Sequence, residues 1–377
     1  MSRPLRIAIS GSGLAGASLT NALLQYLHLD VHIFESAPSF KEAGLAIGLT
    51  RNAQAALDLI GPSAPQLLKR AGAVPMRGVR FVIAQREGQG EVIDEIDDIK
   101  AGKRLTSIVH RAAYLQELLA EVSNERFHAS KKLSSVDRNT DSITLHFTDG
   151  DTHECDILVG ADGIHSTVWR LILGEDNPAA RPRNTGLWAI MSLQPYATAR
   201  ASIGQGLLDS GDAREYSWVG NGSYILHNVL SDGELVQFTI ASSDPVAEAS
   251  DRWQRTVSAD EIKKHYADWP MHLRLAVDEL LCHEPERTAF YLWEHPPART
   301  YVFGPLCIIG SGGGMSIEDS LILSTLLGRT RTPIQAQAAL RAYDQVRRHR
   351  TQRIIESSWG TGTMLISKKQ TIIKIKE

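Results

Sequence analysis

Short apolar runs separated by polar turns dominate the first part of the chain. Leu5–Ser10 is such a run and predicts a buried strand, and a second run, Val31–Phe34, follows a helical segment. Leu57 and Ile60 then lie on one face of a helix predicted over residues 52–60. Because strands and helices alternate, the pattern predicts a doubly wound α/β sheet at the start of the chain.

The pattern changes to successive hairpins in the middle of the chain. Strands are predicted over Tyr216–Val219, Ser223–Leu230 and Leu235–Ala241, with Asn221-Gly222 and Asp232-Gly233 as the turns between them. Turns of this type join antiparallel strands. The middle segment therefore predicts an antiparallel sheet inserted into the α/β framework.

The remaining elements connect these two parts. A helix is predicted over residues 110–122, a hairpin over 143–153, and a strand buried on both faces at Ile157–Gly160. Tyr301–Ile309 predicts a single late strand, followed by a glycine-rich segment and a helix with Ile317, Leu321 and Leu323. A last helix is predicted over residues 334–356. Its four arginines indicate either an anion-binding patch or a solvated helix face, and they are Arg347, Arg348, Arg350 and Arg353.

Composition excludes several classes of protein. The 377 residues carry a formal net charge of -3, which gives no reason to expect nucleic acid or an anionic membrane as partner. Cys155, Cys282 and Cys307 are widely spaced, so neither a disulfide framework nor a metal site is predicted. The first strand begins at Leu5 and no apolar run reaches membrane-spanning length. We expect no signal peptide, no membrane span and a cytoplasmic location.

The segment Gly11-Ser12-Gly13-Leu14-Ala15-Gly16 follows the first strand and opens a helix. Gly11 permits the tight turn, Gly13 lets the backbone approach a pyrophosphate, and Gly16 allows helix and strand to pack closely. The helix N-terminus offers free N–H donors to phosphate oxygens. Glu35 ends the second strand, where a carboxylate can accept hydrogen bonds from a ribose. These features predict an adenine dinucleotide site.

Further motifs narrow the ligand. Arg111 opens a helix, residues 160–166 read Gly-Ala-Asp-Gly-Ile-His-Ser, and residues 314–320 read Gly-Met-Ser-Ile-Glu-Asp-Ser. With the first glycine motif and Glu35, they resemble the FAD-dependent aromatic hydroxylases, in particular the fungal salicylate-hydroxylase-like monooxygenases. The resemblance covers nearly the whole chain. It implies a Rossmann-like FAD-binding domain at 1–184, an inserted antiparallel substrate domain at 185–300, and a return to the FAD domain with a C-terminal helix at 301–377.

The resemblance also implies site residues. Arg111 would supply fixed positive charge to the pyrophosphate or ribityl chain, and Asp162 would lie near both the pyrophosphate and the incoming nicotinamide cofactor. A surface cation at Arg111 and a plain turn at Asp162-Gly163 remain alternatives. The implied FAD-binding residues are Gly11, Gly13, Gly16, Glu35, Gly48, Arg111, Asp162, Gly163, Gly310, Gly312 and Gly313.

The implied reaction is the hydroxylation of a small phenolic aromatic of secondary metabolism, with polyketide-derived compounds among the candidate substrates. FAD is reduced by NADH or NADPH, then reacts with O2 and hydroxylates the ring. Tyr224 and His227 lie in predicted strands of the middle sheet, where they could stack on or deprotonate a phenol. These two are the candidate catalytic residues, and buried core residues are the alternative for each. A monomer or a homodimer is compatible with the sequence.

Two segments depart from the family pattern. Family members follow the late strand with a Gly-Asp pair, a small-residue run with His, and a Pro, whereas here Gly310 is followed at once by Ser311-Gly312-Gly313. The aspartate expected to bind the ribityl chain is thus missing, and weak FAD binding is predicted. Ala189–Met191 lacks the aromatic residue and the arginine implicated in substrate handling. A catalytically silent flavin-fold binding protein and a mis-spliced product therefore remain alternatives, whereas a nicotinamide dehydrogenase is disfavoured.

Overall fold

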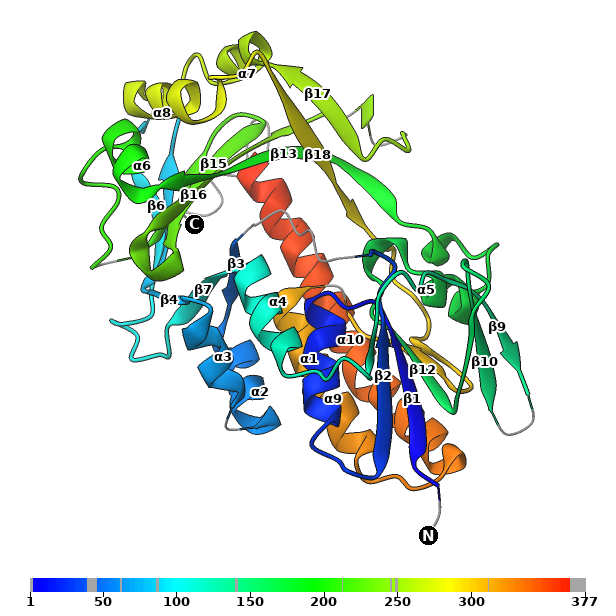
Figure 1. The fold of residues 1–377 in the computed structure, drawn as a ribbon. Helices are drawn as coiled ribbons and strands as arrows, with labels where there is room; N and C mark the ends of the chain where they lie inside the picture. The colour runs from blue at the N-terminus through cyan, green and yellow to red at the C-terminus, as the bar shows by residue number, and fades with distance from the viewer. Residues whose placement is uncertain are drawn as a thin grey trace.

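The first sheet carries the strand order β19-β20-β12-β1-β2-β8 (Figure 1). In this computed structural model, residues 3–38, 46–61, 63–85, 88–139, 142–211, 213–244, 246–247, 250–310 and 312–366 are described. The strands of this sheet are β1 (Leu5–Ser10), β2 (Leu29–Phe34), β8 (Phe127–His128), β12 (Ile157–Gly160), β19 (Val302–Phe303) and β20 (Leu306–Ile308). β1 pairs in parallel with both β2 and β12, as expected for a doubly wound sheet.

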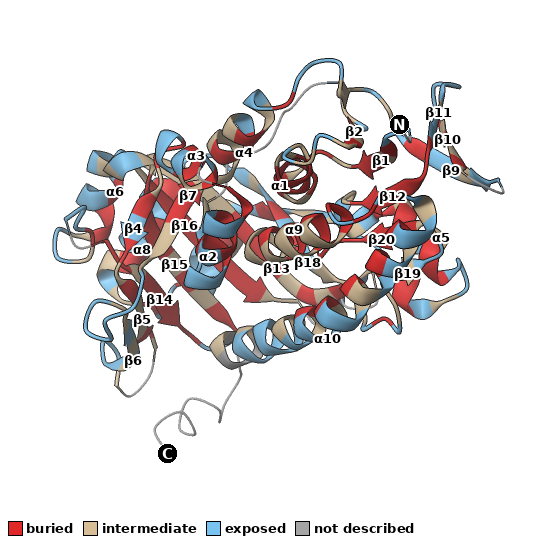
Figure 2. Ribbon diagram, turned by 90° about the horizontal axis from the view of Figure 1, so that it is seen from below, coloured by how far each residue is buried: buried red, intermediate tan, exposed pale blue. Residues whose placement is uncertain are grey.

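Helices cover this sheet and its neighbouring small sheets. Figure 2 shows α1 and α9 side by side, with α10 along one edge of the molecule. The helices around this part are α1 (Leu14–Leu23), α2 (Arg51–Ile60), α3 (Ala64–Arg70), α4 (Arg111–Ala120), α5 (Thr167–Leu173), α9 (Gly313–Leu327) and α10 (Pro333–Ile366). Two short 3-10 turns, Gly163–His165 and Pro178–Ala180, flank α5. Apolar residues of β1, β2, β12, α1, α9 and α10 form one buried cluster. This cluster holds the three helices against the strands of the first sheet.

Two small sheets extend this framework. The first has the order β11-β10-β9 and consists of β9 (Leu133–Arg138), β10 (Ile143–Phe147) and β11 (Thr152–Cys155). The second has the order β3-β7-β4 and consists of β3 (Ala46–Leu49), β4 (Val74–Met76) and β7 (Thr106–His110). β3 carries Gly48, and the N-terminus of α4 follows β7 directly.

The second large sheet has eight strands in the order β17-β18-β13-β16-β15-β14-β5-β6. They are β5 (Gly78–Ile83), β6 (Val92–Asp97), β13 (Arg183–Pro195), β14 (Glu215–Val219), β15 (Ser223–Leu230), β16 (Leu235–Ser243), β17 (Gln254–Ser258) and β18 (Glu286–Glu294). The predicted hairpin strands of the middle segment are confirmed. However, β5 and β6 join this sheet from before residue 185, and β14 pairs with β5 in parallel.

The two faces of this sheet have different surroundings. The short turn Ser231–Gly233 joins β15 to β16, and α6 (Tyr196–Ile203), α7 (Ala259–His265) and α8 (Met271–Leu281) cover the outer face (Figure 1). Side chains alternate between faces along a strand, so Ile225 and Val229 of β15 enter the core beneath these helices. Leu226 and Asn228 point the other way, towards the small β3-β7-β4 sheet.

Two expectations need correction. The predicted single strand Tyr301–Ile309 is a hairpin instead, because Gly304 adopts a φ of 59° and turns β19 antiparallel to β20. The arginines of α10 do not form a common anion-binding patch, and the solvated-face alternative holds for the exposed Arg350 and Arg353 but not for Arg347. Arg347 is buried and paired with Asp319, while Arg350 pairs with Glu318. None of the helices in the described ranges could cross a membrane.

Candidate functional site

The first glycine turn lies directly against the turn that follows β12. Gly11 has a φ of 98°, and a Cβ there would lie 2.5 Å from the Ala161 carbonyl oxygen. A Cβ at Gly16 would lie 1.9 Å from the Gly11 carbonyl oxygen. Real Cβ atoms do not approach backbone atoms this closely, so both positions require glycine. The two turns therefore form one backbone surface at the carboxyl ends of β1 and β12.

Glu35 is tied to this surface. Its carboxylate accepts hydrogen bonds from the Ser12 N–H at 3.0 Å, the Ser12 hydroxyl at 2.5 Å and the Ala37 N–H at 2.9 Å. Partial burial favours the protonated form, but the Ser12 and Ala37 hydrogen bonds outweigh it and lower the pKa of Glu35. An ionised acceptor is thus fixed beside the glycine turn.

Arg111 is the first residue of α4 and reaches the same surface. A Cβ at Gly13 would meet the Arg111 Nη2 at 4.0 Å. Gly13 is also the N-cap of α1 and has no side-chain cap, so the first N–H groups of that helix are open to a ligand. A guanidinium and free amides thus face one another across Gly13.

Asp162 contributes to the fold of this region. It accepts hydrogen bonds from the Ser166 hydroxyl at 2.5 Å and from the Thr167 N–H at 2.7 Å, which fixes the start of α5. Burial raises the pKa of Asp162 against the opposing effect of these donors. Gly163, with a φ of 70°, has no atom within 4 Å of a Cβ position. The backbone at Gly163 is therefore open to an approaching ligand.

The late glycines bring a second helix N-terminus to this site. A Cβ at Gly313 would lie 3.5 Å from Ile47 Cδ1 and 3.9 Å from Leu14 Cδ1, which places the start of α9 beside Gly48 and α1. Gly312, the N-cap of α9, has no side-chain cap. The start of α9 at Gly313 therefore lies beside both the first glycine turn and β3.

Gly310 is bound by a buried ion pair of the protein. Its N–H donates to Asp319 Oδ2 at 2.7 Å, and Asp319 Oδ1 accepts from Arg347 Nε at 2.5 Å. Burial raises the pKa of Asp319, and the Arg347 guanidinium opposes that effect. Ser311 lies outside the described residues. Gly310 is thus anchored to α9 and, through Asp319, to α10.

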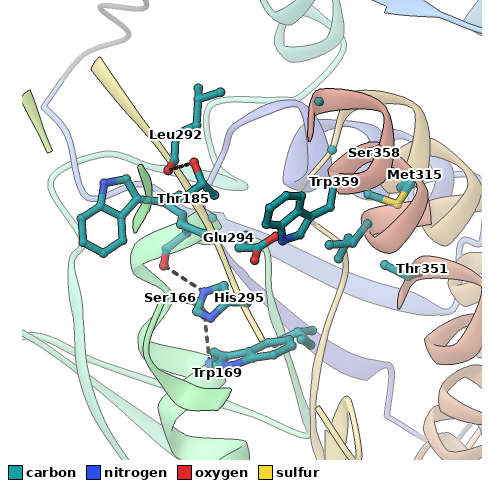
Figure 3. A pocket seen from close by; sticks show the side chains of 18 of the residues that line it. Ser166, Trp169, Thr185, Leu292, Glu294, His295, Met315, Thr351, Ser358 and Trp359 are labelled. Carbon is teal, nitrogen blue, oxygen red and sulfur yellow. Dashed lines mark hydrogen bonds between the residues drawn. The ribbon is translucent and has the colours of Figure 1, made fainter. Parts of the chain in front are cut away.

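A cavity of about 920 Å³ lies beside this connection (Figure 3). We call it the α10 cavity, because α10 provides Thr351 and Trp359 to its wall. Figure 3 shows the Trp169 and His295 rings side by side on the opposite wall. Three buried polar atoms facing this region have no hydrogen-bond partner among the described residues, namely Trp293 Nε1, His295 Nδ1 and Thr351 Oγ1. The cavity thus combines aromatic walls with unused polar atoms.

A second cavity, of about 450 Å³, lies between Gly48 and the second large sheet. We call it the Gly48 cavity. Its walls include Ile108, Leu226, Asn228 and Glu215. The two cavities lie on either side of the start of α9.

The structure separates the two candidate catalytic residues. Tyr224 lies on the face of β15 that carries Leu226 and Asn228, and burial and the nearby Glu215 raise its pKa to about 12. His227 points into the opposite face, where it is fully buried and accepts a hydrogen bond from Trp218 Nε1 at 3.1 Å. Burial lowers the pKa of His227 to about 3, so this ring is neutral. Neither His227 nor Tyr224 is among the described residues that line the two cavities.

Several site residues escape sequence reasoning. Glu215, Asn228 and Gln237 line the Gly48 cavity, yet each comes from a different strand of the second large sheet. The alternation along Ser223–Leu230 is the signal that could have placed Asn228 on the same face as Tyr224. No metal-holding group of His, Cys, Asp and Glu side chains is found in the part of the chain that the structure describes.

Curated relatives match nearly the full chain. The chain is 32% identical over 379 residues to 6-methylsalicylate 1-monooxygenase of Aspergillus terreus, covering 95% of this chain and 82% of that protein. It is 30% identical to an FAD-dependent monooxygenase of Monascus ruber, with 94% and 86% coverage. A salicylate hydroxylase of Pseudomonas putida is 28% identical, with 96% and 86% coverage. No protein-family model matches the chain.

Solved structures share the fold. A salicylate hydroxylase in complex with its substrate superposes with a TM-score of 0.80 at 23% identity, covering 99% of this chain and 93% of that one. Klebsiella pneumoniae HpxO, complexed with FAD and uric acid, gives a TM-score of 0.79 at 20% identity, with 98% and 91% coverage. At these identities, the likeness concerns the fold alone.

Proposed function

We propose that this chain, which belongs to the salicylate hydroxylase-like FAD-dependent monooxygenases, hydroxylates a small aromatic compound with NADH or NADPH and O2 as co-substrates. The main support for this proposal is that the Gly11 turn packs against the Ala161 turn. The backbone surface that they form lies beside the uncapped N-terminus of α1. When bound, FAD supplies the oxygen-transfer chemistry, and the protein supplies binding, orientation and exclusion of water.

The adenosine and pyrophosphate part of FAD fits the first cradle. Gly11, Gly13 and Gly16 leave the backbone free of side chains, and the α1 amides point at a phosphate position. Arg111 would neutralise the pyrophosphate from the far side of Gly13. Glu35 remains ionised, which suits an acceptor for ribose hydroxyls. Each of these groups is already in position in the protein before FAD binds.

The flavin part would lie between Gly48 and the start of α9. Gly312 and Gly313 leave free N–H groups there, and the partial positive charge of a helix N-terminus favours negative charge on a reduced ring. Asp162 and Gly163 would border the pyrophosphate and the nicotinamide co-substrate. Gly310 contributes its N–H to Asp319 instead, so we expect the ribityl chain to be held weakly.

The substrate would lie under the second large sheet, within reach of the flavin. Tyr224 carries a neutral hydroxyl on that face, where it can donate to a substrate oxygen or form a ring contact. His227 would act only by positioning β15 against Trp218 from the other face. The apolar residues in the walls of the two cavities would keep water from the reacting atoms.

The absorption spectrum of the purified chain, after FAD addition and desalting, tests cofactor binding. A second assay follows NADH and NADPH oxidation with and without phenols and identifies products by mass spectrometry. We expect partial retention of FAD, substrate-stimulated oxidation and a product heavier by one oxygen atom. A protein that FAD neither colours nor stabilises would contradict the proposal.

The short Gly310–Gly312 connection favours a second candidate. Without a longer loop between β20 and α9, the α10 cavity stays wide, which suits a flavin-fold protein that binds an aromatic ligand without turnover. Ligand binding with no oxidation of NADH or NADPH in FAD-saturated protein would support this candidate over the first.

A further inference from the structure

The face of the second large sheet that carries Leu226 also carries buried polar groups without hydrogen-bond partners among the described residues. Asn228 is 2% exposed and Thr239 is 5% exposed. Neither Asn228 Nδ2 nor Thr239 Oγ1 has a hydrogen-bond partner among the described residues. Asn228 lines the Gly48 cavity, and Thr239 lies opposite Leu226 of the same face. A buried donor without a partner is costly, so a ligand oxygen is expected at this position.

The charged side chains that the structure describes on the wall of this cavity are both acidic, Asp98 and Glu215. Burial raises the pKa of Glu215 to about 7, and its carboxylate accepts a long hydrogen bond from the Ser217 hydroxyl at 3.4 Å. Tyr224 faces Glu215 from β15 and stays uncharged, because its own pKa is raised to about 12. The described residues therefore make the electrostatic environment of the cavity neutral to negative.

The arginines of the adjacent strands serve the other face. Arg80 of β5 donates to the Tyr216 hydroxyl and pairs with Glu95 at 2.9 Å. Arg214, which precedes β14, is buried and pairs with Glu95 at 2.5 Å. These guanidinium groups are fixed by carboxylates beyond the sheet and are not directed at the Gly48 cavity.

We propose that the Gly48 cavity binds an uncharged phenol, with a ring substituent oxygen accepting from the Asn228 amide and a hydroxyl donating to Glu215. This rests on the proposed function and names its substrate class. An ionised aromatic carboxylate would lose its hydration beside Asp98 and Glu215 and be repelled by them.

Salicylamide and salicylate provide a matched test, because they share size and hydroxyl position and differ in charge. Calorimetry on the full chain with saturating FAD, at about pH 8, measures both affinities without requiring turnover. We expect salicylamide to bind at least about tenfold more tightly, since Glu215 is largely ionised there. Equal affinities, tighter salicylate binding, or binding of neither compound would overturn the proposal.

Two variants locate the effect. In Glu215→Gln, salicylate affinity at about pH 8 should rise severalfold, and the gain that the unmodified chain shows on lowering the pH to about 6 should disappear. Leu226→Arg places a cation in the cavity and should reverse the preference. Circular dichroism checks that both variants fold. An unchanged preference in folded Glu215→Gln would also overturn the proposal, whereas lost turnover with the preference intact would count only against the proposed function.

Discussion

Two glycine-rich turns of this protein each join a strand to a helix, but different contacts hold them in place. The turn after β1 is fixed by backbone contact with Ala161 and by Glu35, which accepts from Ser12. The turn after β20 gives its Gly310 N–H to Asp319 and borders a cavity of about 920 Å³. The first turn is therefore preorganised for a ligand, while the second is organised for the protein itself.

This difference explains how a chain can keep the fold of its family and still bind one end of FAD more tightly than the other. Preorganised donors cost nothing at the moment of binding, whereas a wide cavity must be closed by the ligand or filled by water. The adenine end should thus dominate FAD affinity. The flavin end of FAD should contribute less to the affinity, because this chain provides only some of the contacts to it.

The largest expected effect comes from filling the first turn. Gly16→Ala places a Cβ 1.9 Å from the Gly11 carbonyl oxygen, so α1 must move off the strand ends. We expect FAD affinity to fall by about 100-fold or more, which corresponds to about 2.7 kcal/mol. Fluorescence titration with FAD measures it.

Gly314→Ala is the matched control, because its Cβ would meet Ala53 Cβ at an ordinary 3.6 Å. It should retain FAD. Similar losses in both variants would mean that helix packing in general, and not the first turn, limits binding.

Lengthening the second turn should have the opposite sign. A family-like loop inserted between Gly310 and Gly312 would fill part of the α10 cavity and return an aspartate to the ribityl side. We expect FAD to bind about tenfold more tightly, a gain of about 1.4 kcal/mol. Retention of FAD after desalting reports the change.

An insertion of equal length at Gly150 serves as control, since no atom lies within 4 Å of a Cβ there. It should leave FAD binding unchanged. A tightly bound, stoichiometric flavin in the unmodified chain would remove the proposed difference between the two turns.

Local sequence patterns predicted much of the fold. β1, β12 and β15 begin and end where expected, because the apolar runs there end at glycines or at hairpin turns. The parallel pairing of β14 with β5 could not be predicted, since it joins residues far apart in sequence. Gly304-Pro305 is a turn signal, but the apolar residues before and after it favour one continuous strand over the hairpin.

The site was predicted unevenly for the same reason. Gly11 and Glu35 belong to a contiguous motif whose geometry follows from the backbone. Asn228 and Glu215 come together only when the second large sheet is assembled. His227 carried a catalytic residue type, yet the alternation of β15 directs it into the core. Residue type alone does not give the face of a strand.

Arg111 provides a smaller test of the first turn. Arg111→Ala removes a guanidinium that lies beside Gly13, and we expect FAD affinity to fall about fivefold to tenfold, as for one charge-assisted phosphate contact. Arg104→Ala, which removes a surface pair with Asp58, is the control and should change little. If Arg111→Ala and Arg104→Ala bind FAD equally well, Arg111 does not contact the cofactor.

The smallest effect concerns Glu35 in the absence of FAD. Its pKa is lowered in the folded protein, since the Ser12 and Ala37 hydrogen bonds outweigh partial burial. The stabilisation is therefore present above the unfolded pKa and is lost as the pH falls through the folded value. Because the carboxylate is partly exposed, we expect Glu35→Gln to lower the free energy of unfolding by about 1 kcal/mol or less near pH 7. Urea unfolding of both proteins at about pH 7 and about pH 3.5 measures this difference, which should shrink at the lower pH. A difference that persists in acid would mean that Glu35 holds the first turn by its shape and not by its charge.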